Sequence, residues 1–200
     1  AKSASDPMPD FTSVNNRDRM MVAVEMAGAR AVIARLDWLV TASIDADLPQ
    51  KSGDEMPQNY CLLIAGCSPS KPSKRWPSHG YADIARTALR NGITPVLIGT
   101  AADAEVNQDI KRAVPDVRDM TSRTSLFQLA ALACNAAFII GNDTGPVFLA
   151  ARAGAPTWML MGPDTNPEMS APVGPKVKWL IASPLASLDA AQVCQEIGLE

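Results

Sequence analysis

Short apolar runs that alternate with helical segments are the feature that most constrains how this chain can fold. From residue 60 onward, apolar runs bounded by Gly, Pro or polar residues indicate buried strands. They span residues 60–65, 93–98, 136–140, 156–161 and 177–182. The runs are apolar on both faces, which is typical of a parallel sheet covered by helices on both sides. We therefore expect an α/β, Rossmann-like fold.

Helices are predicted between and after these strands, at residues 78–90, 103–114, 125–133, 146–153 and 187–197. Ser125, followed three residues later by Gln128, predicts a capping box. Gly154 and Gly198 fit the ends of the two later helices. Within the second strand, Pro95 cannot donate a ladder hydrogen bond, so we expect an edge or bulged position there.

The first 57 residues differ from the rest and are interpreted as an inter-domain segment, with residues 58–200 as the globular domain. One helix is expected over residues 17–26, with Gly28 as its stop, and residues 45–58 read as a linker. No signal peptide pattern opens the chain. Because the first residue is Ala1 rather than Met, a cut from a longer protein is one interpretation.

Composition excludes several classes of function. The formal charge is -3 without basic runs, which argues against nucleic-acid binding. The single histidine, His79, argues against a site that needs two imidazoles, and is expected on the surface. The four cysteines form no Cys-x-x-Cys pair, so neither a zinc knuckle nor a disulfide framework is indicated, and a reduced compartment is the simplest interpretation. The longest apolar stretch, residues 129–140, is too short to span a bilayer.

Glycine follows four of the predicted strands, at Gly66, Gly99, Gly141 and Gly162. The carboxyl ends of parallel strands share one sheet edge, where ligands usually bind. Glycine there either makes the strand-to-helix turn or lets the backbone approach a ligand, and both interpretations stay open.

Residues 141–154 (GNDTGPVFLAARAG) run from a strand through a tight turn into a helix. The amides of Thr144, Gly145 and Val147 would lie at the helix start, where free N–H groups and the helix dipole attract phosphate. Asp143 would repel a phosphate. Either Asp143 or Thr144 caps the helix, or Asp143 holds sugar hydroxyls beyond a diphosphate.

Residues 66–77 (GCSPSKPSKRWP) form a basic loop after the first strand. Lys74 and Arg75 suit phosphate binding, although a solvated loop is the simpler interpretation. Residues 162–167 are either a proline-rich turn or a wall of a donor pocket. Asp45-Ala46-Asp47 resembles a metal-binding Asp-x-Asp only superficially, so no metal is expected there. Packing roles are expected for the four tryptophans, which are Trp38, Trp76, Trp158 and Trp179.

Several of these motifs together resemble glycosyltransferase family nine, whose best-known members are lipopolysaccharide heptosyltransferases that use ADP-heptose. The resemblance rests on KRWP (74–77), VLIGT (96–100), NDTGP (142–146), LAARAGAP (149–156) and the turn at 162–167, and more weakly on residues 17–19 and 37–39. It implies the second, donor-binding half of a GT-B fold. The donor site it implies, together with the residues above, comprises Ser68, Lys74, Arg75, Gly99, Asp103, Glu105, Thr124, Asp143, Thr144, Gly145 and Pro146.

Within that site the resemblance implies a role for each part. Lys74 would contact the donor phosphates, residues 144–146 would cradle the diphosphate, and Asp143 would lie beside the sugar. Asp103 or Glu105 would hold the ribose, and Thr124 would lie against the base.

The chain departs from the family pattern in two respects. Phe148 stands where the family usually has His, and the first Rossmann domain, which binds the acceptor and supplies the catalytic base, is absent. We therefore expect the donor-binding portion of an inverting enzyme, inactive alone, that transfers a sugar such as heptose from ADP-heptose to a lipopolysaccharide-type acceptor. No metal cofactor is expected. The expected location is cytoplasmic, with the inner face of the inner membrane as an option. The alternative is a non-catalytic Rossmann-like binding or assembly module.

Overall fold

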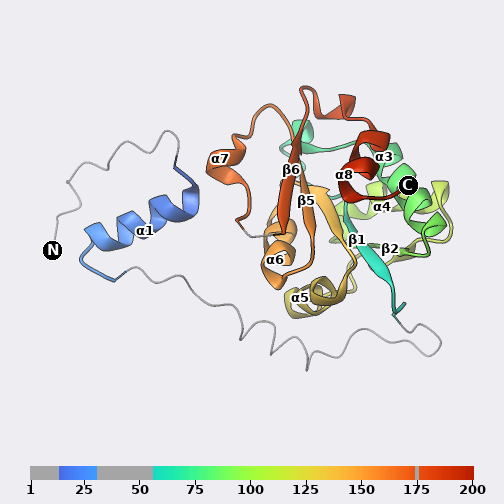
Figure 1. Ribbon diagram of the computed structural model, residues 1–200, viewed down its shortest axis with the longest axis horizontal. Coiled ribbons are helices and arrows are strands. Elements are labelled where there is room, and N and C mark those ends of the chain that lie inside the picture. Colours follow the sequence, from blue (N-terminus) through green and yellow to red (C-terminus); the bar gives the residue numbers. More distant parts are fainter. Residues whose placement is uncertain (1–13, 31–55, 174–175) are drawn as a thin grey trace.

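The computed structural model describes residues 14–30, 56–173 and 176–200. Its centre is a six-stranded parallel sheet in the order β3-β2-β1-β4-β5-β6 (Figure 1). The strands are β1 (Tyr60–Ile64), β2 (Thr94–Leu97), β3 (Arg118–Asp119), β4 (Ile139–Asn142), β5 (Thr157–Met161) and β6 (Val177–Ile181). The expected α/β class is therefore confirmed.

Helices cover both faces of the sheet. Their bounds are α1 (Asn16–Met26), α3 (Ser78–Arg90), α4 (Ala104–Ala113), α5 (Leu126–Asn135), α6 (Gly145–Ala153), α7 (Pro167–Ser170) and α8 (Ala190–Ile197), with the 3-10 turns η1 (Pro72–Lys74), η2 (Ala101–Asp103) and η3 (Leu185–Ser187). Alternate residues of β1 serve the two layers: Cys61 and Leu63 pack with α3, α4 and α8, whereas Leu62 and Ile64 pack with α5 and α6.

Local signals predicted the elements well. The Ser125–Gln128 capping box forms in both directions at the start of α5. Gly154 and Gly198 adopt left-handed conformations, with φ of 112° and 84°, where α6 and α8 end. Two short elements, β3 and α7, were not predicted, because two and four residues are too few to show a periodicity.

The edge position expected for the second strand is wrong, since β2 lies between β1 and β3. Pro95 pairs with Cys61 of β1, but the pairing with β3 begins only at Val96. The missing N–H of Pro95 therefore falls where the neighbouring short strand has not yet begun, which is how an interior strand tolerates the proline.

Two of the tryptophans are core residues as expected, because Trp76 and Trp158 are buried. Trp179 is 42% exposed on the edge strand β6, so burial does not explain it. His79 is exposed in the first turn of α3, as expected. Trp38, Asp45-Ala46-Asp47 and most of the linker at 45–58 lie outside the residues that the structure describes.

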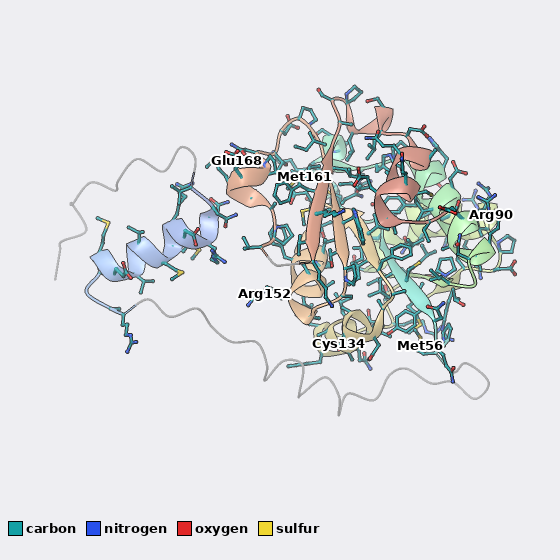
Figure 2. The ribbon with its side chains drawn as sticks, viewed as in Figure 1. Met56, Arg90, Cys134, Arg152, Met161 and Glu168 are labelled. Atoms are coloured by element: carbon teal, nitrogen blue, oxygen red, sulfur yellow. The ribbon has the colours of Figure 1, made fainter. Side chains whose placement is uncertain are left out.

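Side chains fill both layers between the sheet and its helices (Figure 2). Met161 on β5 is fully buried, whereas Arg90 on α3 and Glu168 on α7 face outward. None of the helices in the described part of the chain is both long and apolar enough to cross a membrane.

Helix α1 contacts the rest of the molecule mainly through its first residues. The Asn15 side-chain amide donates to the carbonyls of Glu168 (3.2 Å) and Ala171 (3.3 Å), and the Asn16 amide donates to the Ser170 hydroxyl (3.3 Å). None of the residues of α1 is buried. The helix therefore forms a wall beside α7 without contributing to the core.

Candidate functional site

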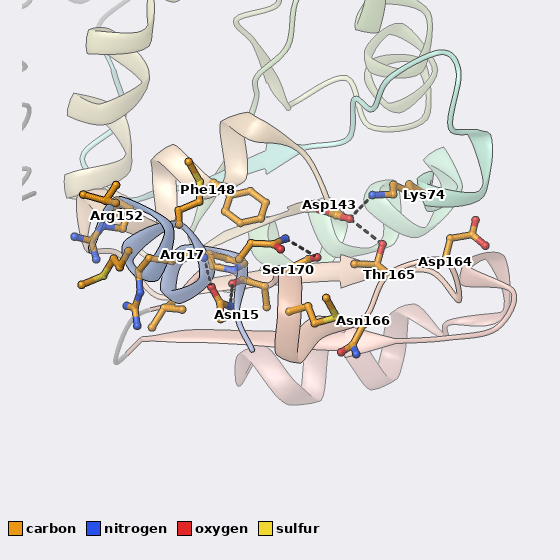
Figure 3. A pocket seen from close by; sticks show the side chains of 18 of the residues that line it. Asn15, Arg17, Lys74, Asp143, Phe148, Arg152, Asp164, Thr165, Asn166 and Ser170 are labelled. Carbon is orange, nitrogen blue, oxygen red and sulfur yellow. Dashed lines mark hydrogen bonds and ion pairs between the residues drawn. The ribbon is translucent and has the colours of Figure 1, made fainter. Parts of the chain in front are cut away.

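Three loops meet at the carboxyl edge of the sheet. They follow β1 (residues 66–75), β4 (143–144) and β5 (162–166). Lys74 Nζ lies 2.5 Å from Asp143 Oδ2, which also accepts a hydrogen bond of 2.9 Å from the Thr165 hydroxyl (Figure 3). The first and third loops are joined directly, because the Ser73 hydroxyl donates to Asp164 Oδ2 over 2.6 Å. The sequence expectation that Lys74 and the turn at 143–145 share one edge is confirmed.

Asn142, the last residue of β4, holds the loop that follows β1. It is fully buried, and its Oδ1 accepts hydrogen bonds from the Trp76 amide (3.1 Å) and the Tyr81 hydroxyl (2.9 Å). Its Nδ2 donates to the carbonyl of Ala65 over 2.8 Å. Burial raises the pKa of the Tyr81 phenol well above its ordinary value, so the hydroxyl stays neutral and donates. The basic loop is thereby fastened to the end of β4.

Two cavities lie on either side of the turn at residues 143–146. The smaller, of about 260 Å³, lies over the ends of β1 and β2 and has an apolar floor of Ile64, Ile98 and Leu129. The larger, of about 920 Å³, lies between α1, α6 and the residues around α7. Thr144 and Pro146 line the smaller cavity, whereas Asp143 lines the larger one. A ligand that crossed this turn would therefore reach both cavities.

Helix α6 begins at this turn with unpaired donors. Among the residues described, the N–H groups of Thr144 and Gly145 donate to no protein acceptor. Thr144 occupies the N-cap position of α6, as one interpretation had it, but no side chain makes a capping hydrogen bond there. Free N–H groups and the positive end of the helix dipole together attract an anion.

Most of the predicted site residues line one cavity or the other. Lys74 and Asp143 line the larger cavity. Six further predicted residues line the smaller cavity: Ser68, Gly99, Asp103, Thr124, Thr144 and Pro146. Gly145 lies between the last two of these in the chain.

Besides Gly145, two predicted residues line neither cavity. Arg75 is exposed, lines neither cavity, and donates to the carbonyl of Cys67 over 3.0 Å. Glu105 is exposed in the first turn of α4 and lines neither cavity. Of the two carboxylates considered for a ribose, only Asp103 lies beside a cavity, and its Oδ2 already accepts from the Thr100 amide and hydroxyl.

The glycines after the strands serve packing. A Cβ on Gly66 would lie 2.2 Å from Asp103 Oδ1, and one on Gly162 would lie 2.7 Å from the Ser73 carbonyl. Gly141 lies inside β4, where a Cβ would meet Val147. Protein atoms fill the space that a side chain at these glycines would need, but the backbone at Gly66 and Gly99 also lines the smaller cavity, so both interpretations of the glycines stay open. Gly145 is different, since a Cβ there would meet no atom within 4 Å.

Replacing Gly66 or Gly145 with Ala distinguishes a glycine whose Cβ position is filled by protein atoms from one whose Cβ position is empty. Gly66→Ala must push away a carboxylate held by two hydrogen bonds, so we expect a loss of about 1–3 kcal/mol in the free energy of unfolding. Gly145→Ala is expected to leave stability unchanged within about 0.5 kcal/mol. Urea unfolding measures both. Equal losses for the two variants would contradict this description of the glycines.

Charges are concentrated in the larger cavity. The cations that line it are Arg17, Arg30, Lys74 and Arg152, against the carboxylates Asp143 and Asp164. Arg17 is paired with Asp18 at 2.7 Å. In the smaller cavity, burial raises the pKa of the Cys67 thiol, which therefore stays protonated and weakly nucleophilic at neutral pH. Within the described ranges, His, Cys, Asp and Glu side chains form no group of three that could hold a metal ion.

Sequence reasoning missed three contributors. Asn142 was quoted only inside a motif, although it holds the site together. Thr165 stood in the turn at 162–167, interpreted either as a proline-rich turn or as a wall of a donor pocket, and was not singled out, although its hydroxyl reaches Asp143. Helix α1 had been assigned to an inter-domain segment, and it supplies a wall of the larger cavity. All three depend on contacts between distant parts of the chain, which local patterns do not report.

An open parallel sheet with two cavities over its carboxyl edge and an uncapped helix start between them defines a Rossmann-like domain of the kind found in GT-B glycosyltransferases. The family model of glycosyltransferase family 9 (heptosyltransferase) matches residues 22–196. The chain therefore belongs to this family.

Comparison with individual proteins agrees with that assignment. The lipooligosaccharide heptosyltransferase 2 of Haemophilus influenzae is 32% identical over 110 residues, which cover 52% of this chain and 32% of that protein. A family 9 glycosyl transferase from Veillonella parvula superposes with a TM-score of 0.75 at 20% identity, covering 94% of this chain and 61% of the other. The E. coli heptosyltransferase WaaC with ADP gives 0.68 at 20% identity, with 88% and 53% covered. The chain thus spans only part of each of these proteins.

Proposed function

We propose that this chain is the donor-binding portion of an inverting glycosyltransferase that uses a nucleoside-diphosphate sugar. The observation that carries the proposal is the meeting of Lys74 Nζ and the free amides of residues 144–145 at one turn between two cavities. A cation beside unpaired N–H groups at a helix start is suited to a diphosphate. The family assignment and a relative described with ADP support the same ligand class.

In this proposal each cavity receives one end of the donor. The nucleoside would occupy the smaller cavity, whose floor is apolar and whose rim carries Ser68, Asp103 and Thr124. The diphosphate would cross the turn at residues 144–145. The sugar would enter the larger cavity beside Asp143.

The chemistry follows from where charge develops. An acceptor hydroxyl, deprotonated by a carboxylate, attacks the anomeric carbon while the bond to the nucleoside diphosphate breaks. The leaving diphosphate gains negative charge, which Lys74 and the start of α6 would stabilise. The acceptor-binding site and the carboxylate base would belong to a first domain of the kind that the family carries. No metal is part of the proposal.

The names of the relatives guide the finer part of the proposal. Heptose as the sugar, ADP as the nucleotide and a lipopolysaccharide-type acceptor are proposed because the similar proteins are named lipopolysaccharide or lipooligosaccharide heptosyltransferases. A cytoplasmic location at the inner face of the inner membrane is proposed on the same ground. Alone, the chain is proposed to bind the donor and transfer nothing.

Isothermal calorimetry with ADP and ADP-heptose tests the proposal. We expect both ligands to bind, with dissociation constants from micromolar to millimolar, because Lys74 and the free amides of residues 144–145 belong to this chain. ADP-heptose is expected to bind more tightly than ADP, and adenosine more weakly, since the diphosphate supplies the contacts to Lys74 and the helix start. An absence of heat with both ADP and ADP-heptose at millimolar concentration would contradict donor binding and favour a non-catalytic module.

A further inference from the structure

Thr165 is a buried polar residue whose hydroxyl has one partner within the described structure. Its side chain lies in the loop after β5, and the residue is only 8% exposed. The hydroxyl donates to Asp143 Oδ2 over 2.9 Å. Burying a hydroxyl is unfavourable unless it is hydrogen-bonded, so this contact fixes the rotamer of both side chains.

The two oxygens of Asp143 are therefore used differently. Oδ2 accepts from both Lys74 Nζ and the Thr165 hydroxyl, whereas Oδ1 accepts from no described residue. Three side-chain polar atoms of the described residues are fully buried without a hydrogen-bond partner, and Asp143 Oδ1 is not one of them. Oδ1 is therefore accessible from the larger cavity that Asp143 lines. A carboxylate oxygen in this position can accept a hydroxyl hydrogen from a ligand.

The loop that carries Thr165 does not need this hydroxyl to keep its place. Ser73 holds the neighbouring Asp164 through a 2.6 Å hydrogen bond, and the Thr165 amide donates to the Gly162 carbonyl (3.3 Å). Removing the hydroxyl should therefore release Asp143 rather than the loop.

We propose that Thr165 is a positioning residue for the donor sugar. By holding Oδ2 together with Lys74, it turns Oδ1 toward the larger cavity, where Oδ1 accepts a hydrogen bond from a sugar hydroxyl. The inference rests on the proposed donor-binding function and goes beyond it, because it assigns a residue that acts through Asp143 and only on the sugar end of the donor.

The test compares Thr165→Val with Thr165→Ser in the 200-residue chain, with ADP-heptose and ADP as probes in calorimetry. Thr165→Val keeps the shape of the side chain but removes the hydroxyl. We expect the affinity for ADP-heptose to fall about tenfold, and that for ADP, which has no sugar at Asp143, to fall less than about threefold. Thr165→Ser is expected to restore most of the affinity for ADP-heptose.

Thr157→Val is the matched control. Thr157 is buried like Thr165, and its hydroxyl donates to the Ala155 carbonyl over 3.0 Å at the opposite end of β5. We expect this variant to lose a similar amount of stability without any change in the affinity for ADP-heptose. Unfolding in urea verifies that all variants are folded at the temperature of the binding measurement.

A double-mutant cycle with Asp143→Asn shows whether Thr165 acts through Asp143. We expect Thr165→Val to have no further effect on ADP-heptose affinity once Asp143 is replaced. Equal losses for ADP and ADP-heptose, additive effects in the cycle, or an unchanged affinity in Thr165→Val would each overturn the positioning role. If the parent chain binds neither ligand, the proposed function fails and the inference fails with it.

Discussion

Replacing Lys74 with Met is expected to weaken the binding of both ADP and ADP-heptose by about 10- to 100-fold, the cost of losing a hydrogen bond between charged groups. Lys74 is paired with the turn, with its Nζ 2.5 Å from Asp143 Oδ2. Without it, the carboxylate of Asp143, whose side chain is 8% exposed, would face the diphosphate uncompensated. Calorimetry with both ligands measures the loss.

Lys71→Met is the matched control for charge. Lys71 lies in the same loop, is exposed and lines neither cavity. The same loss of one positive charge is expected to change the affinity less than about twofold at physiological salt, since exposed charges are screened. If the two Met variants bind ADP equally well, Lys74 does not contact the diphosphate.

The largest effect on stability is expected from Asn142→Ala. The substitution leaves the Trp76 amide, the Tyr81 hydroxyl and the Ala65 carbonyl without the partners they have in the buried side chain. Each orphaned buried group costs about 1–3 kcal/mol, so we expect a total loss of about 3–5 kcal/mol in the free energy of unfolding. Unfolding in urea, followed by circular dichroism, measures it.

Asn135→Ala serves as the comparison for this variant. Asn135 is exposed at the end of α5, and its side chain donates only to the Ala131 carbonyl one turn earlier (3.2 Å). We expect a change within about 0.5 kcal/mol. Similar losses in the two variants would mean that Asn142 does not fasten the basic loop to β4.

Much of the fold was predictable because its signals are local. Apolar runs mark five of the six strands, and the Ser125–Gln128 capping box and Gly154 mark helix ends at the places expected. The strand β3 has only two residues, and its pairing with β2 gives no sequence pattern. The position of Pro95 within the sheet was wrong for the same reason, since it depends on how short β3 is.

The candidate site was predictable only in part. The turn at 143–145 and Lys74 could be placed on one edge because every strand of a parallel sheet ends there. That Lys74 would pair directly with Asp143 could not be predicted, since the pairing depends on how the loops fold over the edge. The role of the glycines could not be decided from the sequence, because a glycine that admits a ligand and one that admits a neighbouring side chain look the same there. Only the surroundings of Gly66 and Gly145 distinguish them.

Strand β1, in the interior of the sheet, is synthesised long before β4, one of its two neighbours. Residues 62–64 of β1 pair with residues 139–141 of β4. At usual rates of synthesis, the ribosome needs roughly 4 to 15 seconds to add the intervening residues. During that time β1 has an open edge, and Leu62 and Ile64 lack the cover of α5 and α6. The nascent chain therefore exposes an apolar strand for seconds, a period in which a chaperone has access to it.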